Sequence, residues 1–323
     1  MSARSPFFRR AVYVTGATGL LGGWLVRRLV DLGAQVVALV RDARPASNLH
    51  RWGLDQRIDR VRGELEDQAL QERILAEYEV ETVFHLAAQT LVPVANRAAA
   101  STFSANVAGS VSLFEAARRC PTLRSLVFTS SDKAYGDHGG LPYVEEMDLR
   151  GGMPYEASKA AADLIAQSYA RAFGLPIGVS RAGNLFGGGD LNPSRIVPGT
   201  IRALLDGERP VIRSDGRPVR DYLYVEDAVD GLLAIAGAVE AGARGRAWNL
   251  SSEEPRDVVG IVAEINAVMG LAVEPVVLGG ASAELPFQTL NARRARAELG
   301  WRPRFGLRAG LAATVDWHRQ EGR

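Results

Sequence analysis

Tyr155 and Lys159 lie four residues apart in "YEASK", inside a stretch that predicts a long helix from about residue 154 to residue 173. Residues at i and i+4 share one face of a helix, so the phenol and the amine are expected side by side. An ordinary tyrosine ionises near about pH 10 and is a poor base at neutral pH. A neighbouring ammonium stabilises the phenolate, so the pair is predicted to accept a proton from an alcohol.

Lys133 and Lys159 are the only lysines among the 38 basic residues of the chain; all the others are arginines. A lysine amine is compact and can lose its proton when buried, whereas an arginine presents a wide planar fork that stays charged. The composition therefore predicts that both positions need a compact amine and that Lys133 acts in its deprotonated form. Two alternatives stay open for Lys133, which are an ion pair with Asp132 and the chance survival of a lysine.

Gly16, Gly19 and Gly22 follow the first predicted strand with the spacing G-x-x-G-x-x-G, in "VTGATGLLGG". The first glycine permits the tight turn, the second lets a pyrophosphate approach the backbone, and the third lets the helix pack on the strand. The free N–H groups of the helix N-terminus attract anions. This loop predicts a dinucleotide site, with Glu64 and Leu65 of "GELED" beside the adenine, although a plain strand-to-helix turn explains those two residues almost as well.

The end of the second predicted strand, "ALVRDARPAS", bears on the choice of dinucleotide. An acid at this position accepts the adenosine ribose hydroxyls of NAD, and Asp42 fits that role. Arg41 or Arg44, with Ser47, could instead hold the 2′-phosphate of NADP. NAD is favoured and NADP stays open.

The elements that must position these residues alternate between strand and helix. Short apolar runs such as "RAVYVTG", "AQVVALV", "TVFHLAA" and "LRSLVFTS" predict buried parallel strands, with helical patterns between them. The order indicates a Rossmann-type, doubly wound α/β sheet, and "AWNLSS" is expected to be a strand returning to it. We expect a dinucleotide-binding domain at 1–183 and roughly 222–252. A smaller, discontinuous α/β substrate lobe is expected at roughly 184–221 and 253–323.

The composition is that of an ordinary soluble protein, with 47% hydrophobic and 23% charged residues among 323. A formal net charge of +1 gives no reason to expect nucleic acid or a membrane surface as partner. A single cysteine, Cys120, is expected to be structural and fits a reducing cytoplasm. No signal peptide, membrane span or metal site is expected, because no run of 18 apolar residues occurs and the four histidines lie far apart.

Seven segments in order resemble the extended short-chain dehydrogenase/reductase family, the NAD-dependent epimerases and dehydratases, over nearly the whole chain. They are "TGATGLLGG", "VFHLAAQ", "NVAGS", "FTSSDKAYG", "YEASK", "RAGNLFGGGD" and "RDYLYVEDA". The resemblance implies NAD(P) on the N-terminal sheet and a nucleotide-diphosphate sugar in the C-terminal lobe. It implies Ser131, Tyr155 and Lys159 as the catalytic set, with the serine bonded to the sugar O4. The implied cofactor contacts also include Thr18, Leu20, Leu21, Leu86, Ala87 and Ala88.

Within this family, the sugar 4,6-dehydratases carry an acid–base pair directly after the position of Ser131. After oxidation at C4, an acid protonates the leaving C6 hydroxyl while a base removes the C5 proton, and the stored hydride then returns to C6. Many such enzymes have Asp-Glu there. This chain has Asp132-Lys133, which looks like the CDP-glucose 4,6-dehydratases. A 4-epimerase needs no such pair, so the departure from Asp-Glu keeps an epimerase open, and a non-catalytic cofactor-binding protein is a third possibility.

The resemblance also suggests which residues hold the nucleotide sugar. Arg220 in "RDYLYVED" matches the family's diphosphate-binding arginine, and the fork of arginine suits phosphate. Asn184, Arg195, Arg213 and Gln89 are further candidates. The base and the sugar stay open. A homodimer is expected because the relatives are dimers.

Overall fold

The computed structural model describes residues 5–140, 142–280 and 285–320. The chain folds into two compact units, each built from three segments. The first unit comprises Met1–Gly136, Glu145–Arg181 and Val229–Trp248; the second comprises Asp137–Val144, Ala182–Ala228 and Asn249–Arg323. Compared with the expected boundaries, the returning segment of the first unit is shorter, and the second unit gains the short segment 137–144.

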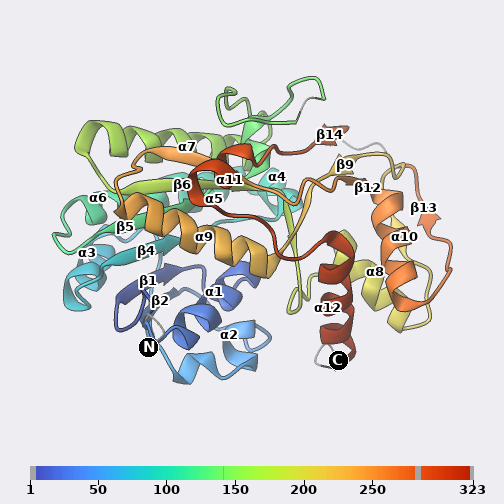
Figure 1. Cartoon of the computed structure of the whole chain (residues 1–323), viewed down its shortest axis with the longest axis horizontal. Helices are drawn as coiled ribbons and strands as arrows, with labels where there is room; N and C mark the ends of the chain where they lie inside the picture. Colours follow the sequence, from blue (N-terminus) through green and yellow to red (C-terminus); the bar gives the residue numbers. More distant parts are fainter. Residues whose placement is uncertain (1–4, 141, 281–284, 321–323) are drawn as a thin grey trace. The chain divides into compact units, whose positions relative to one another are not determined.

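The first unit is built on a seven-stranded sheet with the order β11-β6-β5-β4-β1-β2-β3 (Figure 1). Its strands are β1 (Ala11–Thr15), β2 (Gln35–Val40), β3 (Asp59–Arg62), β4 (Thr82–His85), β5 (Ser125–Thr129), β6 (Ile177–Ala182) and β11 (Arg246–Leu250). The pairs from β3 through β6 are parallel. The strand order reverses between β1 and β4, which is where open α/β sheets bind ligands. The predicted Rossmann-type fold is confirmed, and so is the expected strand at "AWNLSS", which is β11.

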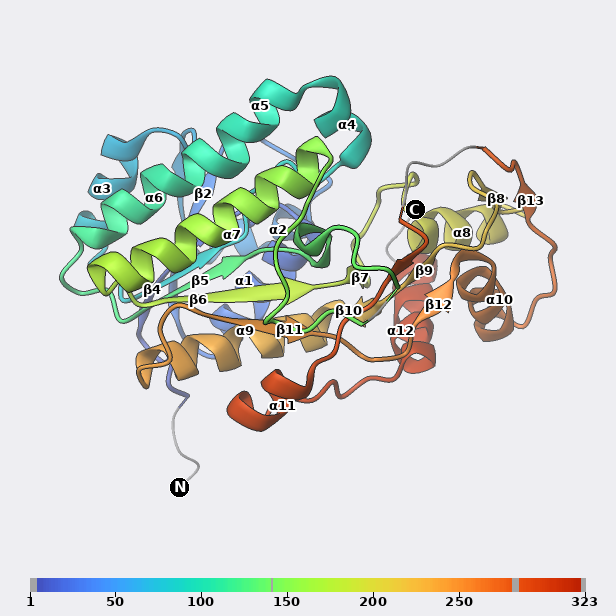
Figure 2. The same ribbon diagram turned by 90° about the horizontal axis from the view of Figure 1, so that it is seen from above.

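Helices cover both faces of this sheet. Figure 2 shows α5 (Ala99–Phe103), α6 (Gly109–Arg118) and α7 (Pro154–Phe173) along one side and α9 (Val225–Glu240) along the other. The core of the first face joins α3 (Gln68–Glu77), α6 and α7 to the strands through residues such as Ile74, Phe114, Phe128 and Ala166. On the second face α9 packs so closely that a Cβ at Gly178 would lie 2.6 Å from Val239. The helix predicted at 154–173 is confirmed as α7.

Several short helical segments of the first unit were not anticipated by the sequence pattern. They include α2 (Asn48–Arg51), η1 (Leu54–Gln56), α4 (Val92–Arg97) and α5. A turn of π-helix, η2 (Ser104–Ala108), lies directly before α6. A π-helical turn carries one more residue per hydrogen bond than an α-helix, and such turns are frequent at functional sites. The buried residue of this turn is Asn106.

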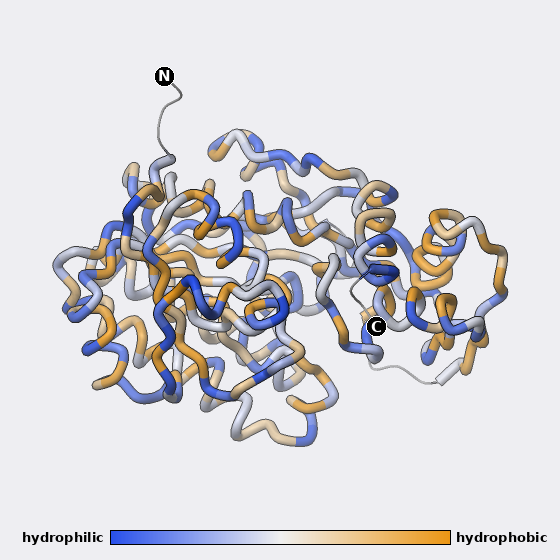
Figure 3. Tube along the Cα trace, turned by 90° about the horizontal axis from the view of Figure 1, so that it is seen from below, coloured by the Kyte–Doolittle hydropathy of each residue, from blue (hydrophilic) through white to orange (hydrophobic). Residues whose placement is uncertain are grey.

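The described part of the second unit combines small sheets with helices. The sheets are β7–β10 (Asn184–Phe186, Tyr222–Tyr224), β12–β9–β14 (Arg256–Asp257, Val219–Arg220, Phe287–Gln288) and β13–β8 (Val276–Val277, Val211–Ile212). The helices are α8 (Ile196–Leu205), α10 (Val258–Met269), α11 (Arg293–Leu299) and α12 (Leu307–Gln320). Figure 3 colours most of α8 and α10 as hydrophobic. Helix α12 lies on β7 and β10, where a Cβ at Gly310 would meet Phe186 and Tyr224.

Among the described residues, no helix is both long enough and apolar enough to cross a membrane.

Candidate active site

The glycine loop after β1 has the shape that a bound pyrophosphate requires. Gly16 has φ +77°, and a Cβ there would lie 2.7 Å from the backbone nitrogen of Ala87. A Cβ at Gly22 would lie 2.1 Å from the Gly16 carbonyl oxygen, so the helix can pack on the loop only with glycine. Helix α1 (Leu20–Asp31) starts at Gly19 with no side chain capping it, so its first N–H groups stay available for an anion. The loop therefore fits a dinucleotide.

The end of β2 carries an exposed ion pair. Arg41 Nε donates to Asp42 Oδ2 at 2.7 Å, and both side chains are 56% exposed. The hydrogen bond from Arg41 lowers the pKa of Asp42, and Arg44 and Arg62 act in the same direction. Asp42 is therefore a carboxylate, the form that accepts ribose hydroxyls. A 2′-phosphate would have to compete with this carboxylate for Arg41.

A buried hydrogen-bonded pair holds the loop that is predicted to contact the adenine. Tyr13 of β1 donates its hydroxyl to Gln71 of α3 at 2.7 Å. The Gln71 amide in turn donates to the carbonyls of Glu64 and Leu65, at 3.4 and 3.3 Å. The backbone of these two residues is thus held by the core of the sheet, which a plain surface turn does not require.

A chain of hydrogen bonds connects β1 with β4 at the point where the strand order reverses. Thr15 Oγ1 accepts from the backbone nitrogens of Leu86 and Ala87, so its own proton goes to His85 Nδ1 at 2.7 Å. Ser110 Oγ donates to the Asn106 carbonyl and therefore accepts from His85 Nε2 at 2.9 Å. These partners assign the neutral tautomer with the proton on Nε2. Burial, together with the charge of Lys159, lowers the pKa of His85 to about 3, so the ring stays neutral.

The π-helical turn extends this chain to α7. Asn106 lies in that turn, and its amide bonds the backbone of Gln89 on both sides, accepting from the nitrogen at 2.6 Å and donating to the oxygen at 3.1 Å. The same amide donates to Ser158 Oγ at 2.9 Å, and Ser158 donates to the Tyr155 carbonyl at 2.7 Å. Buried polar groups thus connect the ends of β1 and β4, where the cofactor is predicted to bind, with the first turn of α7.

Helix α7 carries Tyr155 and Lys159 on its buried side, with 8% and 4% of each residue exposed. Pro154 begins the helix, and the Glu156 carboxylate accepts from the backbone nitrogens of Gly152 and Met153. The helix start that positions Tyr155 is therefore well defined by local sequence.

The amine of Lys159 is held at the end of β5. Its Nζ donates to the Thr129 carbonyl at 2.5 Å and lies 4.8 Å from the centre of the Phe128 ring. Burial lowers the pKa of Lys159 to about 8, and the charge of Asp163 opposes this shift. The amine is protonated at neutral pH, as the stabilisation of a phenolate requires.

Ser131, Asp132 and Lys133 lie where β5 ends and a short 3-10 turn, η3 (Asp132–Tyr135), begins. Ser131 donates its hydroxyl to Asp132 Oδ1 at 2.9 Å and accepts from the Lys133 backbone nitrogen at 3.2 Å. Asp132 is only 1% exposed. In the part of the chain that the structure describes, Asp132 Oδ2 has no hydrogen-bond partner. A buried carboxyl oxygen without a partner is costly, so Asp132 Oδ2 is suited to bonding a ligand.

Two of the predicted substrate ligands, Asn184 and Arg220, lie close together in the second unit. Asn184 begins β7 and donates its backbone nitrogen to the Asp221 carbonyl at 2.8 Å, next to Arg220 at the end of β9. Arg220 is 5% exposed, and its guanidinium donates to the Val219 carbonyl. Gly183 is needed at this contact, because a Cβ there would lie 2.7 Å from the Asp221 oxygen.

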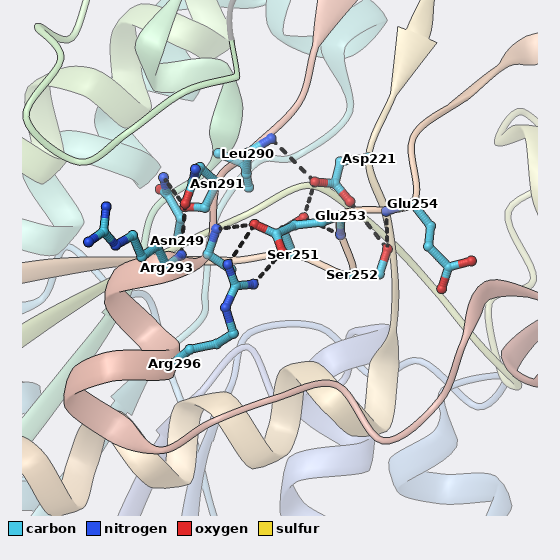
Figure 4. A network of polar contacts seen from close by, with 11 residues as sticks. Asp221, Asn249, Ser251, Ser252, Glu253, Glu254, Leu290, Asn291, Arg293 and Arg296 are labelled. Carbon is cyan, nitrogen blue, oxygen red and sulfur yellow. Dashed lines mark hydrogen bonds and ion pairs between the residues drawn. The ribbon is translucent and has the colours of Figure 1, made fainter.

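A buried polar network fixes the backbone around Asp221 (Figure 4). The Asp221 carboxylate accepts from the Ser251 hydroxyl and from the Leu290 backbone nitrogen. Nearby, Glu253 has φ +58°, forms an ion pair with Arg296 and accepts from the Ala292 nitrogen at 3.0 Å. The network joins the segment after β11 to the segment before α11, and it holds the strand end that carries Arg220.

Arg195 and Arg213 form the other neighbouring pair of predicted ligands. Arg195 donates to Asp190 Oδ2 and to the Leu185 carbonyl, both at 2.5 Å, and Asp190 is buried. Arg213 is exposed and donates to the Ser194 carbonyl at 3.4 Å. A phosphate would thus share Arg195 with an existing carboxylate, whereas Arg213 is held more loosely. All four of these predicted ligands belong to the second unit, and Gln89 belongs to the first.

Several polar residues of this site were missed by the sequence reasoning: His85, Asn106, Asp163, Arg181 and Tyr135. The signals that could have found them are specific. Asp163 continues the four-residue spacing of Tyr155 and Lys159 on the buried face of α7, and Arg181 is a charged residue in a strand that is buried throughout. A charged residue in a strand that is buried on both faces requires a buried partner.

Comparison with known proteins places this geometry in a family. The family model described as "NAD dependent epimerase/dehydratase family" matches residues 12–251. The chain belongs to the NAD-dependent epimerase/dehydratase family. The resemblance inferred from the seven sequence segments is thereby confirmed.

Relatives of both reaction types within the family are similar to this chain. It is 29% identical to a CDP-glucose 4,6-dehydratase of Salmonella typhimurium, covering 96% of this chain and 90% of the relative. It is 32% identical to a UDP-glucose 4-epimerase of Mycolicibacterium smegmatis, covering 95% and 98%. Among solved structures, the NAD complex of a dTDP-glucose 4,6-dehydratase from Bacillus anthracis has a TM-score of 0.85 and 26% identity, with 97% of each chain covered. The protein is thus related to nucleotide-sugar dehydratases and epimerases, and identity alone does not separate them.

Proposed function

We propose that this protein is an NAD-dependent nucleotide-sugar 4,6-dehydratase, which converts a nucleotide-diphosphate hexose to the 4-keto-6-deoxy sugar with loss of one water. The observation that carries the proposal is the Asp132-Lys133 pair in η3, directly after Ser131. Asp132 is buried, and one of its oxygens has no partner among the described residues. A 4-epimerase has no elimination step, and so no need of an acid at this position.

In the proposed mechanism, each catalytic residue of the first unit has its own role in proton transfer or binding. Ser131 bonds the hydroxyl at C4, and Tyr155 removes its proton while the Lys159 ammonium stabilises the phenolate. The resulting ketone acidifies the proton at C5. Lys133 takes that proton and Asp132 protonates the departing C6 hydroxyl, so that water leaves. Each proton that the sugar loses or gains thus has a partner residue in the chain.

The cofactor site is proposed from the loop that fits a dinucleotide. Gly16, Gly19 and the start of α1 would hold the pyrophosphate, and Asp42 would hold the adenosine ribose. When bound, NAD supplies the hydride acceptor for C4 and the donor for the final reduction at C6, so it is regenerated. The remaining proposed cofactor contacts are Thr18, Leu20, Leu21, Arg41, Glu64, Leu65, Leu86, Ala87, Ala88, Tyr155 and Lys159.

The substrate ligands are likewise proposals. Arg220, Asn184, Arg195 and Arg213 would neutralise the diphosphate and contact the nucleotide, because arginine forks match phosphate oxygens. Gln89 is a further proposed contact of the sugar. We also propose a cytoplasmic homodimer. The exposed apolar side chains of α5 and α7, Phe103 at 40% and Leu164 at 54%, favour an association through these helices. Size-exclusion chromatography with light scattering measures the mass of the assembly.

A second candidate is the 4-epimerase, because a UDP-glucose 4-epimerase of Mycolicibacterium smegmatis is as similar to this chain as the dehydratases are, with 32% identity. Incubation with CDP-, dTDP- and UDP-glucose in deuterated water separates the two by NMR and mass spectrometry. A dehydratase gives a product that has lost water and carries deuterium at C5. An isomer of unchanged mass without deuterium would show that the proposed dehydratase function is wrong and that the protein is an epimerase.

As a further arm, Lys133→Arg is expected to lose C5 labelling and to retain NAD binding. A protein that binds NAD and converts no sugar would be a binding protein.

A further inference from the structure

The residues proposed for dehydration are carried by two separate elements. The proton-transfer pair, Tyr155 and Lys159, lies on α7, whereas the elimination pair, Asp132 and Lys133, lies in the short turn η3. A 3-10 turn of four residues has little rigidity of its own. Something must therefore hold this turn against the helix if acid, base and sugar are to meet within a fraction of an ångström.

A buried arginine from a third element contacts both. Arg181 of β6 makes a bidentate ion pair with Asp163 of α7, with Nε–Oδ2 at 2.9 Å and Nη2–Oδ1 at 3.0 Å. Its remaining nitrogen, Nη1, donates to the hydroxyl of Tyr135, the last residue of η3, at 2.9 Å. The guanidinium carbon also lies 4.9 Å from the centre of the Tyr135 ring. One planar group thus joins helix, strand and turn.

The surroundings make this junction rigid. Arg181 is 2% exposed, and Asp163 and Tyr135 are fully buried. Asp163 Oδ1 also accepts from Gln167 at 2.7 Å, which fixes the carboxylate on the helix. Burial raises the pKa of Tyr135, so the phenol keeps its proton and its oxygen accepts from the arginine. In such a dry setting each of these directional bonds is strong, and breaking one leaves a buried polar group unpaired.

We propose that Arg181, together with Asp163 and Tyr135, is a positioning group that holds the elimination turn in register with the proton-transfer helix. The proposal rests on the proposed dehydratase function. In the hydrogen bonds that the structure describes, the Arg181–Asp163 pair contacts neither the coenzyme loop nor the predicted diphosphate ligands.

The two halves of the reaction depend on this junction to different degrees. Ser131, which serves oxidation, follows Ser130, whose backbone nitrogen is tied to the Ser180 carbonyl of β6 at 2.8 Å. Asp132 and Lys133, which serve elimination, lie between that tie and Tyr135. Loosening Tyr135 therefore displaces the elimination pair more than it displaces Ser131 or the residues of α7.

Tyr135→Phe tests the proposal, because it keeps the ring and removes only the oxygen that accepts from Arg181. Two steps are followed with whichever of CDP-, dTDP- and UDP-glucose the wild-type protein dehydrates. Oxidation is read as the absorbance of reduced nicotinamide in a single turnover, and elimination as the rate of water loss with C5 deuterium uptake. A displacement of about 1 Å costs up to about 100-fold in rate, so we expect elimination to fall about tenfold or more and oxidation to change less than about threefold.

Tyr169→Phe is the matched control. Tyr169 also lies on α7 and donates its hydroxyl to a carboxylate, Glu115, at 2.7 Å, but it contacts no residue of η3 in the hydrogen bonds that the structure describes. It is expected to leave both steps unchanged. Arg181→Lys is a second test, because a lysine keeps the charge beside Asp163 and lacks the fork that also reaches Tyr135. It should show the same preferential loss of elimination.

Three results have distinct meanings. If the wild-type protein forms no product lighter by one water, the proposed function fails and this inference fails with it. If the wild-type protein dehydrates and Tyr135→Phe slows both steps by the same factor, or slows neither, the inference alone is overturned. A selective loss of elimination, with oxidation and the thermal unfolding temperature close to those of Tyr169→Phe, supports it.

Discussion

Two arginine–aspartate pairs of the first unit have nearly equal lengths and opposite surroundings. Arg181 and Asp163 meet at 2.9 Å with side chains 2% and 0% exposed, whereas Arg41 and Asp42 meet at 2.7 Å with both side chains 56% exposed. The first pair lies between β6, α7 and η3, and the second lies at the end of β2. Distance alone would rank them together.

Burial makes the two pairs different kinds of interaction. The buried charges have no water to replace a lost partner, so their geometry is fixed by Tyr135 and Gln167 as well as by each other. The exposed charges can turn to other partners, because Glu64 and Glu66 also act on Arg41. A buried pair thus suits the positioning of catalytic elements. An exposed pair suits the choice between NAD and NADP, which differ by one phosphate group.

The largest effect is expected from breaking the buried pair on one side. Arg181→Met leaves the Asp163 carboxylate buried without its counter-charge, which costs about 3 to 5 kcal/mol of unfolding free energy. Urea unfolding followed by circular dichroism measures the loss. The double variant Arg181→Met/Asp163→Leu removes both charges and is expected to recover much of it.

Arg28→Met is the control for that measurement. Arg28 pairs with Asp230 across α1 and α9 at 2.8 Å, with side chains 30% and 22% exposed. Because water reaches this pair, its loss is expected to cost no more than about 1 kcal/mol. Equal losses in Arg181→Met and Arg28→Met would show that burial does not distinguish the pairs.

Sequence alone led to most of this fold and only to part of the site. The apolar runs, the glycine spacing and the "YEASK" segment predicted the sheet, the phosphate loop and α7, because each of these follows from local periodicity or local backbone geometry. The Arg181–Asp163 junction depends on residues 18 positions apart that meet through tertiary packing, and its third member, Tyr135, lies 46 residues from Arg181. The π-helical turn at Ser104–Ala108 has no periodic signature either. The roles of the individual site residues stay predictions until variants test them.

A smaller effect is expected on pH dependence when the acidic side of the buried pair is changed. Asp163 opposes the lowering of the Lys159 pKa that burial causes, so Asp163→Asn should lower this pKa below its present value of about 8. In the proposed mechanism Lys159 acts as the ammonium, which is lost as pH rises through the pKa. The alkaline limb of the oxidation rate should therefore move to lower pH. The initial rate of oxidation is measured from roughly pH 6 to roughly pH 10, because a lysine with a lowered pKa titrates within this range.

The neighbours of Lys159 make this limb interpretable. His85 of β4 stays neutral because its pKa is about 3, and Arg181 of β6 stays charged because Asp163 raises its pKa against the effect of burial. Tyr155 on the same helix is the group that the ammonium is proposed to stabilise as a phenolate, and Tyr135 of η3 stays protonated because burial raises its pKa. An alkaline limb unmoved in a folded Asp163→Asn protein would show that this carboxylate does not tune Lys159. Stability gives an independent check. Between about pH 8 and 10.5, Lys159 is protonated in the unfolded chain and largely deprotonated in the folded protein, so the unfolding free energy should rise with pH across that window.

At the exposed pair, Arg41 and Asp42, we expect the smallest effect on stability. We expect a change in dinucleotide preference there instead. Asp42→Asn removes a carboxylate that would accept a ribose hydroxyl and repel a 2′-phosphate, and it releases Arg41. The ratio of NAD to NADP affinity should fall about tenfold, the scale of one hydrogen bond to a charged group, with no measurable change in the unfolding midpoint. Quenching of tryptophan fluorescence during titration with each dinucleotide measures the ratio. Asp148→Asn, in the exposed pair with Arg150 at 3.2 Å, is the matched control and should leave the ratio unchanged. An unchanged ratio in Asp42→Asn would remove Asp42 from the ribose site and with it the functional half of the contrast between the two pairs.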